Sequence, residues 1–354
     1  MKVITVNSYK SNYPGGIETL IRGFHGLPSL ASYSFIEFYR NESDKQLYED
    51  NPAVRYLQYG SKGKSFEKIK SRFSLYSGFL KLNPSRGVIV IFHPSDLLSI
   101  PYGILRKNKV VVVQTNRLDV YFSLAARLAL RLYSDLIDFF TVYTEMDRLK
   151  LCSMYPELNE KVRVIPRGCR IRTSDKVATY STKLVTVTRL DEKQKQLKTM
   201  VEIVKGLPES YTLDIYGDGP DDEIEYVKGL ASTCERVSFL GHVSNVEEVL
   251  KDYSVFLMTS AYEGFGQTLI EARSQGLPIV MFNTFDAAAF IVNDGFNGFL
   301  LPSGDIHGFR KRVIDITSSK DVFNTYSINS LAKSAETDLD LINREWDSVF
   351  NEGS

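Results

Sequence analysis

Short apolar runs alternate with amphipathic helical stretches along the whole chain, and this alternation constrains the fold more than any other feature. In the first half we predict strands at residues 3–6, 34–39, 54–59, 88–92, 110–113, 139–143 and 162–165. Helical patterns, such as residues 17–24 and 123–133, lie between several of them. This alternation is typical of parallel sheets covered by helices on both faces, so we expect an α/β fold.

A second series of the same kind follows. It predicts strands at residues 184–188, 211–216, 237–240, 255–258, 278–282 and 298–301. With 354 residues the chain exceeds the length at which one core usually stops growing, so we predict two Rossmann-like domains. We expect an N-terminal domain at 1–169, a C-terminal domain at 170–335, and a helix within 336–354 that crosses back to the first domain. The polar stretch 170–181 is the predicted linker.

Composition and charge narrow the class of protein. An apolar fraction of 43% and a charged fraction of 24% are ordinary for a globular chain and argue against disorder. Cys152, Cys169 and Cys234 form no C-x-x-C pair, so we expect inert thiols in a reducing compartment. Residues 1–172 hold 26 Lys and Arg against 15 Asp and Glu, and the remainder holds 17 against 28. The basic first half suggests an anionic partner, with a solvated charged face as the alternative.

The apolar runs also indicate the cellular compartment in which the protein is expected. Residues 1–7 become polar after one short apolar run, which predicts no signal peptide. The strongest runs, 88–92 and 110–113, are far shorter than the roughly 20 residues of a membrane-spanning helix. We therefore expect a cytoplasmic protein, without a nucleic-acid partner.

Residues 260–278, S-A-Y-E-G-F-G-Q-T-L-I-E-A-R-S-Q-G-L-P, are the most informative segment. A glycine-rich turn between a strand and a helix lets the backbone approach a ligand, and the first amides of the helix form an anion site suited to a diphosphate. Glu263 precedes the predicted helix and Glu271 lies two turns along it, and their spacing of eight residues keeps both carboxylates on roughly the same helical side. One can bind a sugar and the other a ribose. The alternative is a simple glycine turn with a capping Glu263 and a surface Glu271.

Several segments of the second half resemble the family-4 glycosyltransferases of the GT-B fold, in the right order. The E-x7-E pattern from Glu263 to Glu271 is that family's signature. Further similarity lies at residues 187–195, 215–220, 239–243 and 293–302. The resemblance implies two facing Rossmann-like domains and retaining transfer of a sugar from a nucleotide diphosphate donor. A UDP-sugar is favoured and a GDP-sugar is possible, with a hexosyl or N-acetylhexosaminyl group transferred.

The resemblance also implies roles for individual residues. Arg189 and Lys195 are expected to stabilise the leaving diphosphate and to act with Glu263 in catalysis, with Lys193 as the competing choice for Lys195. A guanidinium fork, an ammonium and fixed amide dipoles suit the charge that grows on the phosphate. The donor-binding residues it implies are Gly15, Gly16, Gly217, His242, Val243, Gly264, Phe265, Gly266, Gln267, Thr268 and Glu271.

The first half matches the family less fully. Residues 14–18, P-G-G-I-E, resemble its G-G-x-E element, which would face the donor; a loop that starts a helix is the alternative. Arg167 replaces a customary Asn, and Phe290 stands where the family is often acidic, with Asp286 as a compensating candidate. Residues 114–116 replace a histidine. The acceptor-binding candidates are His93, Asn116 and Arg117, and a structural role is the alternative for His93.

No metal or other cofactor is expected. Four scattered histidines offer no zinc-ligand spacing. The D-x-D at Asp338 and Asp340 falls in the terminal helical stretch, where a solvated helix face is the better interpretation.

The acceptor is expected to be a saccharide or a lipid-diphosphate-linked saccharide, as in the synthesis of lipopolysaccharide, O-antigen or capsule. Residues 60–86 combine many cations with aromatic residues at helical spacing, which suits an anionic membrane interface at the inner face of the plasma membrane. Packing of these aromatics into the core is the alternative. Two other functions share the fold: a nucleotide-sugar 2-epimerase and a non-catalytic sugar-nucleotide binding protein.

Overall fold

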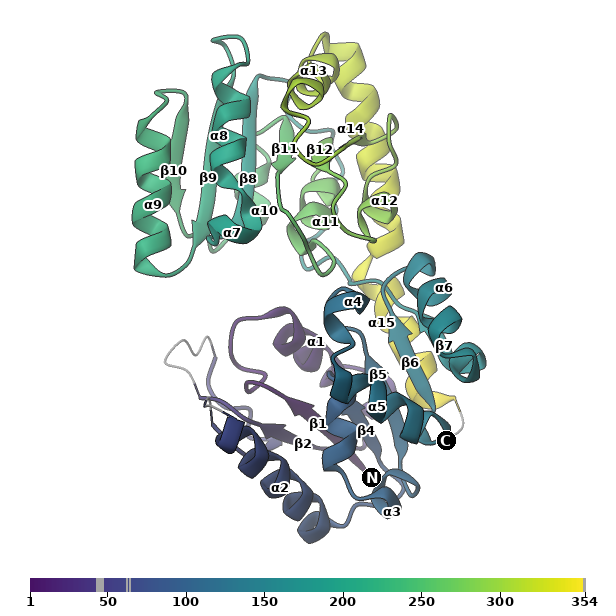
Figure 1. Cartoon of the computed structure of the whole chain (residues 1–354). Coiled ribbons are helices and arrows are strands. Elements are labelled where there is room, and N and C mark those ends of the chain that lie inside the picture. The colour runs from purple at the N-terminus through teal and green to yellow at the C-terminus, as the bar shows by residue number, and fades with distance from the viewer. Residues whose placement is uncertain (43–47, 62, 64, 353–354) are drawn as a thin grey trace. The chain divides into compact units, whose positions relative to one another are not determined.

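The computed structural model describes residues 1–42, 48–61, 63 and 65–352, and the chain divides into two compact units (Figure 1). Unit 1 comprises Met1–Pro166 with Ile342–Ser354, and unit 2 comprises Arg167–Leu341. The first boundary between the units, after Pro166, falls three residues before the expected end of the first domain. The second boundary, after Leu341, falls inside the terminal helix.

The polar stretch 170–181 lies within unit 2 and does not link the units, contrary to our expectation. The backbone N–H of Ser174 donates to the carbonyl of Ser274 over 2.8 Å. The N–H of Ala178 donates to the hydroxyl of Ser327 over 2.8 Å. These bonds hold the irregular segment against two helices of unit 2.

Unit 1 contains a parallel seven-stranded sheet in the order β3-β2-β1-β4-β5-β6-β7. Its strands are β1 (Lys2–Asn7), β2 (Ser34–Tyr39), β3 (Val54–Gln58), β4 (Val88–Ile91), β5 (Lys109–Val113), β6 (Phe139–Val142) and β7 (Val162–Val164). The order reverses between β1 and β4, which makes this pair the topological switch point of the sheet. All seven predicted strands are confirmed.

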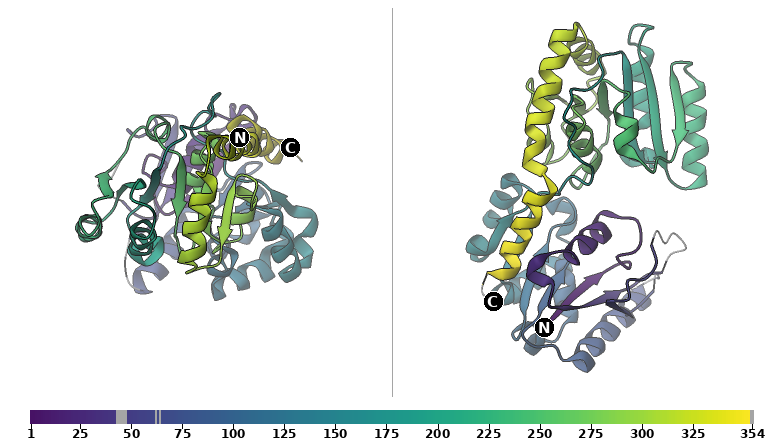
Figure 2. Two further views of the ribbon diagram at one scale, coloured as in Figure 1. Left: turned by 90° about the horizontal axis from the view of Figure 1, so that it is seen from above. Right: turned by 180° about the vertical axis from the view of Figure 1, so that it is seen from behind.

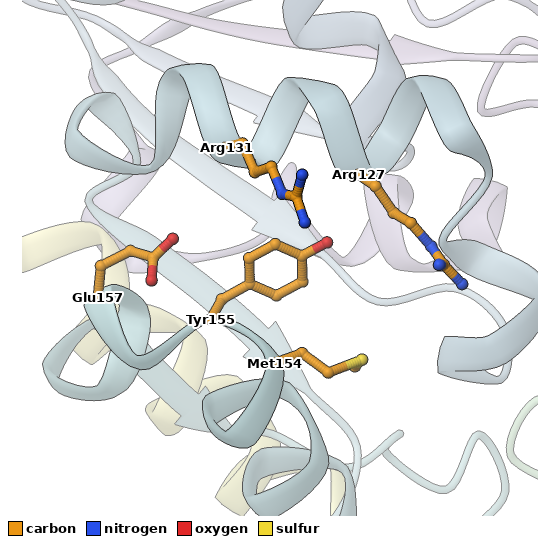
Figure 3. Close-up of a pocket in the computed structure, with 5 residues that line it drawn as sticks. All are labelled: Arg127, Arg131, Met154, Tyr155 and Glu157. Carbon is orange, nitrogen blue, oxygen red and sulfur yellow. The ribbon is translucent and has the colours of Figure 1, made fainter.

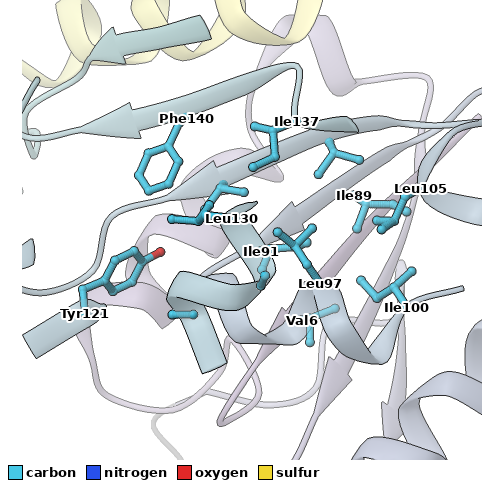
Figure 4. Close-up of a cluster of buried hydrophobic side chains, with 14 of the residues drawn as sticks. Val6, Ile89, Ile91, Leu97, Ile100, Leu105, Tyr121, Leu130, Ile137 and Phe140 are labelled. Carbon is cyan, nitrogen blue, oxygen red and sulfur yellow. The ribbon is translucent and has the colours of Figure 1, made fainter. Parts of the chain in front are cut away.

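Helices cover both faces of this sheet. They are α1 (Gly16–Phe24), α2 (Ser65–Leu82), α3 (Tyr102–Leu105), α4 (Leu118–Tyr121), α5 (Leu124–Tyr133), α6 (Glu145–Met154) and α15 (Leu339–Asn351), with short 3₁₀ turns η1 (Pro28–Leu30), η2 (Pro94–Ser99), η3 (Ser134–Leu136) and η4 (Pro156–Lys161). Successive residues of a strand face opposite sides, so Val88 and Val90 belong to one buried cluster, and Ile89 and Ile91 to the other. This explains why the strands are apolar throughout. Figure 4 shows the cluster that contains Ile89 and Ile91.

The end of the chain completes one of these two cores. Trp346 of α15 contacts Phe24 of α1 with ring centroids 4.9 Å apart, and Phe350 lies 5.2 Å from the same ring. The ammonium of Lys109, at the start of β5, donates to the carbonyl of Phe350 over 2.8 Å. In the rear view of Figure 2 the last turns of α15 run beside α1. The terminal helix therefore packs into unit 1.

Unit 2 contains a parallel six-stranded sheet in the order β10-β9-β8-β11-β12-β13. Its strands are β8 (Lys183–Arg189), β9 (Thr212–Asp218), β10 (Val237–Gly241), β11 (Val255–Met258), β12 (Ile279–Phe282) and β13 (Gly298–Leu301). Its helices are α7 (Glu192–Lys195), α8 (Leu197–Lys205), α9 (Asp221–Ser232), α10 (Val246–Leu250), α11 (Gln267–Ser274), α12 (Ala288–Ile291), α13 (Ile306–Ile316) and α14 (Lys320–Ser334), followed by the turn η5 (Ala335–Thr337). All six predicted strands are confirmed, and the switch point lies between β8 and β11.

None of the helices in the described part of the chain combines the length and apolar character needed to cross a membrane.

Candidate active site

The candidate site of unit 2 lies at the switch point of its sheet. In open parallel sheets, ligands bind beyond the carboxyl ends of the strands where the strand order reverses. Arg189 is the last residue of β8, and the loop that begins at Thr259 follows β11. Because these two strands are neighbours, the cation and the loop that carries Glu263 meet at one edge of the sheet.

Arg189 extends into solvent from that edge. Its side chain is 68% exposed. One guanidinium nitrogen donates to Oε1 of Gln194 over 2.9 Å, and it lies 3.6 Å from the carboxylate of Asp191. The guanidinium is therefore oriented from one side and keeps donors available for a ligand.

Lys195 and Glu263 form a buried ion pair. Nζ of Lys195 lies 2.5 Å from Oε1 of Glu263, and the two side chains are 11% and 10% exposed. The hydroxyl of Ser260 donates to the same oxygen over 2.7 Å. Lys193, the competing candidate, is exposed, so Lys195 is the lysine that reaches this cluster.

Lys195 lies at a tight turn between two helices. It closes α7, and the next helix begins at Leu197. Between them Gln196 has φ 51°, a left-handed conformation that is uncommon outside glycine. The hydroxyl of Thr259 donates to the carbonyls of Lys195 and Gln196 over 2.9 and 3.1 Å. These two hydrogen bonds hold the tight turn between α7 and α8 that positions Lys195.

Gln194 is a site residue that the sequence analysis did not identify. It is 8% exposed. Its Oε1 accepts from Arg189, and its Nε2 donates to the carbonyl of Tyr262 over 3.1 Å and to Glu263 over 3.5 Å. One buried amide thus connects the β8 end with the acidic loop. Its position within the E-K-Q-K run gave no signal, because such a run reads as a solvated helix face.

The glycine-rich turn leads into α11 as expected. Gly266 has φ 92°, and a Cβ there would lie 2.8 Å from Cδ1 of Leu269, so this position requires glycine. Helix α11 begins at Gln267, and the amides of its first turn point away from the helix. The side chain of Phe265 is buried, which leaves only its backbone for a ligand. Thr268, in the first turn, is partly exposed.

Glu271 lies on α11, and its surroundings differ greatly from those of Glu263. Its side chain is 2% exposed, and Oε1 accepts from Nε of Arg170 over 2.7 Å and from Gln267 over 3.5 Å. Burial raises the pKa of Glu271, and Arg170 opposes this shift. Its other oxygen, Oε2, is buried and has no partner among the described residues. This oxygen is free to accept a hydroxyl hydrogen bond.

Glu263 precedes α11, as predicted, but the left-handed Gly266 lies between this residue and the helix. Helical spacing therefore does not relate the two carboxylates, contrary to our expectation. Glu263 pairs with Lys195, and Glu271 pairs with Arg170.

The remaining predicted residues of unit 2 lie near other strand ends. A Cβ on Gly217, in β9, would lie 2.2 Å from the carbonyl oxygen of Thr188, so this glycine allows β8 and β9 to approach closely. His242 follows β10 and is exposed, and Val243 is partly buried. Phe290, at the position where an acid was expected, contacts the ring of Phe265 at 6.0 Å between centroids.

The predicted residues of unit 1 lie around the carboxyl edge of its own sheet. Gly15 precedes α1, which begins at Gly16, and the carboxylate of Glu18 lies so close that a Cβ on Gly15 would clash with it. Nδ1 of His93, after β4, lies 2.7 Å from the hydroxyl of Ser95.

Asn116 and Arg117 follow β5. Oδ1 of Asn116 accepts from the N–H of Arg117 over 2.8 Å, a local bond at the start of α4. These predicted contacts of unit 1 remain predictions.

Two cavities of unit 1 are lined by charged side chains. The smaller, of about 290 Å³, lies between α5 and η4 and is lined by Arg127, Arg131 and Tyr155. Arg131 extends toward the ring of Tyr155 (Figure 3). The larger, of about 650 Å³, lies at the carboxyl edge of the sheet and includes His93.

Among the side chains of the described ranges, no group of three or more His, Cys, Asp or Glu is arranged to hold a metal ion. Oδ1 of Asp338 accepts from the N–H groups of Asp340 and Leu341, so this end of the D-x-D caps α15.

Residues 181–319 match the family model described as Glycosyl transferases group 1. The GtfA subunit of a UDP-N-acetylglucosamine–peptide N-acetylglucosaminyltransferase from Streptococcus pneumoniae serotype 4 is 32% identical over 183 residues. That alignment covers 49% of this chain and 36% of the relative, so the chain spans well under two thirds of that protein.

Solved structures match over nearly the whole chain. HepE of Anabaena in complex with UDP has a TM-score of 0.77 at 18% identity, with 98% of each chain covered. The lipopolysaccharide outer core galactosyltransferase WaaB has a TM-score of 0.75 at 20% identity, with 99% of each chain covered.

The chain contains two parallel sheets, each with a topological switch point, and it is similar in structure to HepE and WaaB. These features define a GT-B fold. Within this fold, residues 181–319 of unit 2 are similar to the group 1 glycosyl transferases.

Proposed function

We propose that this chain is a retaining glycosyltransferase that uses a nucleotide diphosphate sugar, with UDP-sugars favoured. It transfers a hexosyl or N-acetylhexosaminyl group to a hydroxyl of a saccharide or lipid-linked saccharide. The observation that carries the proposal is the cluster of Arg189, Lys195 and Glu263 at the switch point of a group 1 domain. The two cations suit a diphosphate, and the carboxylate suits sugar hydroxyls.

The reaction places negative charge where these cations lie. As the bond from the anomeric carbon to the diphosphate breaks, Arg189, Lys195 and the first amides of α11 stabilise the departing phosphate. The acceptor oxygen bonds to the anomeric carbon on the same face, and its proton passes to an oxygen of the leaving phosphate. No dedicated base is needed in this scheme. Donor binding exchanges the Lys195–Glu263 contact for contacts to the phosphate and to the sugar.

Glu271 is proposed to bind the donor ribose. Its unpartnered Oε2 is a buried acceptor, and the bond from Arg170 to Oε1 fixes its rotamer. Glu271→Ala should therefore raise the donor KM substantially, with Arg344→Ala as a surface control. An unchanged donor KM in a folded Glu271→Ala protein would remove the ribose assignment.

The donor assignment is tested by thermal shift and product analysis. UDP and a panel of UDP- and GDP-sugars are titrated, since a ligand that binds only the folded state raises the midpoint with concentration. Transfer to added saccharides is then followed with the donor that binds. Failure of every nucleotide to stabilise the protein would contradict the proposal. Transfer in excess EDTA tests metal independence, and loss of activity restored by Mg²⁺ or Mn²⁺ would refute it.

The same assays separate the two alternatives. A nucleotide-sugar 2-epimerase converts the sugar nucleotide without an acceptor, whereas a transferase releases UDP in proportion to an acceptor product. A non-catalytic binding protein shows stabilisation by UDP without turnover. The two relatives named here are transferases, which supports transfer over epimerisation.

Helix α2 is proposed to dock on an anionic membrane surface from the cytoplasmic side. It buries Ser71, Leu75 and Phe79 against the sheet and exposes a stripe of apolar side chains on its outer side. The stripe consists of Phe66, Ile69, Phe73, Tyr76 and Leu80, exposed by 75%, 55%, 72%, 42% and 54%. Packing of these residues into the core, the alternative interpretation, is therefore wrong. Lys62 and Lys64 of the predicted basic segment lie outside the described residues.

Vesicle binding tests this docking. The double variant Phe66→Ser/Phe73→Ser should lose at least about tenfold in affinity for phosphatidylglycerol vesicles, because both rings insert at the interface. Leu124→Ser/Leu132→Ser on α5, exposed by 87% and 60%, is a matched control. Equal, weak binding of the unmodified protein to phosphatidylglycerol and phosphatidylcholine vesicles would refute membrane docking.

A further inference from the structure

The larger cavity of unit 1 occupies the switch point of the first sheet. It is bounded by the end of β1 at Asn7, by Arg40 after β2, by Tyr59 after β3 and by His93 after β4. Its volume of about 650 Å³ lies in the range of small-molecule sites. The position and the size both indicate a ligand site.

Three cations line this cavity. Arg40 follows β2, and Lys68 and Arg72 lie one turn apart on α2, so both face the same side of that helix. No ion pair joins any of the three to a carboxylate of the described residues. Nε of Arg40 is buried without a hydrogen-bond partner there, as is the hydroxyl of Ser99. Buried donors of this kind are costly unless a ligand or water satisfies them.

The other titratable groups of the cavity do not cancel this charge. Burial lowers the pKa of His93, and Arg72 and Arg40 lower it further, which keeps the imidazole neutral. Burial raises the pKa of Asp96 to about 7, although Arg40 and Arg72 oppose the shift. Burial raises the pKa of Tyr59, and the negative charge of Asp96 raises it further. The cavity is therefore positive at neutral pH.

Apolar side chains complete the lining. Ile17, Ile69 and Leu75 line the cavity together with the cations. Ile69 is also a member of the exposed stripe on α2, so the positive cavity and the apolar stripe adjoin. A ligand with an anionic head and an apolar or sugar extension matches this combination.

We propose that this cavity binds a phosphate group carried by the acceptor, held by Arg40, Lys68 and Arg72. The assignment rests on the proposed glycosyl transfer, because it names the acceptor class for that reaction. Arginine forks and lysine ammonium groups bind phosphate oxygens by charge-assisted hydrogen bonds. The phosphate belongs either to a lipid-linked carrier, whose chain follows the stripe of α2, or to a phosphorylated sugar.

Calorimetry with four probes tests the proposal in the presence of saturating UDP. Geranyl diphosphate represents the lipid-linked source, glucose 6-phosphate represents a phosphorylated sugar, and geraniol and glucose are the neutral counterparts. We expect one phosphorylated probe to bind and its neutral counterpart to bind at least about tenfold more weakly. The probe that binds more tightly identifies the source.

Variants connect this binding to the cavity. Arg72→Gln and Arg40→Gln should each weaken the phosphorylated probe by about 10–100-fold, the scale of one charged hydrogen bond. Lys70→Gln is the matched control, since Lys70 lies on the same helix but does not line the cavity. Asp96→Asn should tighten binding at pH 8 by several-fold, because it removes the opposing carboxylate. The exposed Arg72 keeps the test valid if Arg40→Gln fails to fold.

The outcomes separate this inference from the donor assignment. UDP affinity should stay unchanged in Arg72→Gln, because Arg189, Lys195 and Glu271, which are proposed to bind the diphosphate and the ribose, lie in unit 2. Absence of UDP binding would contradict the proposed function, while probe binding without UDP would still report on the cavity. Absence of binding by both phosphorylated probes, or binding that Arg40→Gln and Arg72→Gln leave unchanged, would overturn the phosphate site.

Discussion

Replacing Lys195 by methionine removes the cation of a buried ion pair while keeping most of the side-chain volume. Lys195 and Glu263 are 2.5 Å apart and nearly buried. Removal of one partner from such a pair costs about 3–5 kcal/mol, because the other charge stays buried and unpaired. Ser260 and Gln194 still donate to Glu263 in this variant. We therefore expect the free energy of unfolding to fall by about 3 kcal/mol, near the lower limit of that range.

The double variant Lys195→Met/Glu263→Gln separates the charge effect from packing. It leaves no uncompensated charge, so its free energy of unfolding should lie within about 1 kcal/mol of the unmodified protein. The coupling free energy between the two sites should then be about 2 kcal/mol or more. For a domain of this size, 3 kcal/mol corresponds to a fall of about 6–12 °C in the midpoint.

Stabilisation by UDP distinguishes a donor contact from a purely structural role. UDP at about 100 times its Kd should raise the free energy of unfolding of the unmodified protein by about 2.7 kcal/mol. Both variants should lose most of this gain, because Lys195 is absent from the diphosphate site. Lys193→Met is the matched control: its side chain is exposed, so stability should change by less than about 0.5 kcal/mol with full UDP stabilisation.

Two results would refute this reasoning. A double variant as unstable as Lys195→Met would mean that the unpaired charge of Glu263 is not the cause of the loss. Full stabilisation by UDP in Lys195→Met would mean that this ammonium does not contact the diphosphate.

Three further predictions address other parts of the molecule. Arg189→Ala should lower turnover by about 10²–10³ at saturating donor, with little change in the unfolding midpoint because the side chain is exposed; Arg189→Lys should restore only part of the rate. Asp96 keeps its proton in the folded state up to about pH 7, so its contribution to stability should fall as pH rises from about 4 to 7. Asp96→Asn should remove that decrease in urea titrations across this range. Trp346→Ala should destabilise unit 1 by about 3–5 kcal/mol while UDP still stabilises unit 2, as followed by calorimetric scans.

The strands were predictable because parallel sheets covered on both faces demand continuous apolar runs. Every predicted run forms a strand whose ends differ by no more than two residues. The glycine-rich turn was equally predictable, since the left-handed position before α11 is occupied by a glycine, Gly266, which the sequence shows directly. These features depend on neighbours in sequence, which a pattern can show.

The partners of the site were not predictable, because they come from distant residues. Arg170 pairs with Glu271 across 101 positions, within a stretch that the sequence analysis treated as a linker. Arg273 is fully buried, donates to the hydroxyl of Thr337 over 2.8 Å, and has its pKa lowered by burial to about 10. Gln196 adopts a left-handed φ that its residue type does not favour. Only the packed structure reveals these contacts.

The two switch points differ in how their charges are balanced, and this difference has a consequence for binding. In unit 2 Lys195 is already paired with Glu263, so a donor must separate two buried charges before its phosphate can contact the lysine. Glu263→Gln removes the competitor but also weakens the proposed contact to the sugar. UDP alone should therefore bind Glu263→Gln at least as tightly as the unmodified protein, whereas the UDP-sugar should bind less tightly. Parallel titrations measure this ratio, and an equal loss of both affinities would show that Glu263 orders the lysine instead of competing for it.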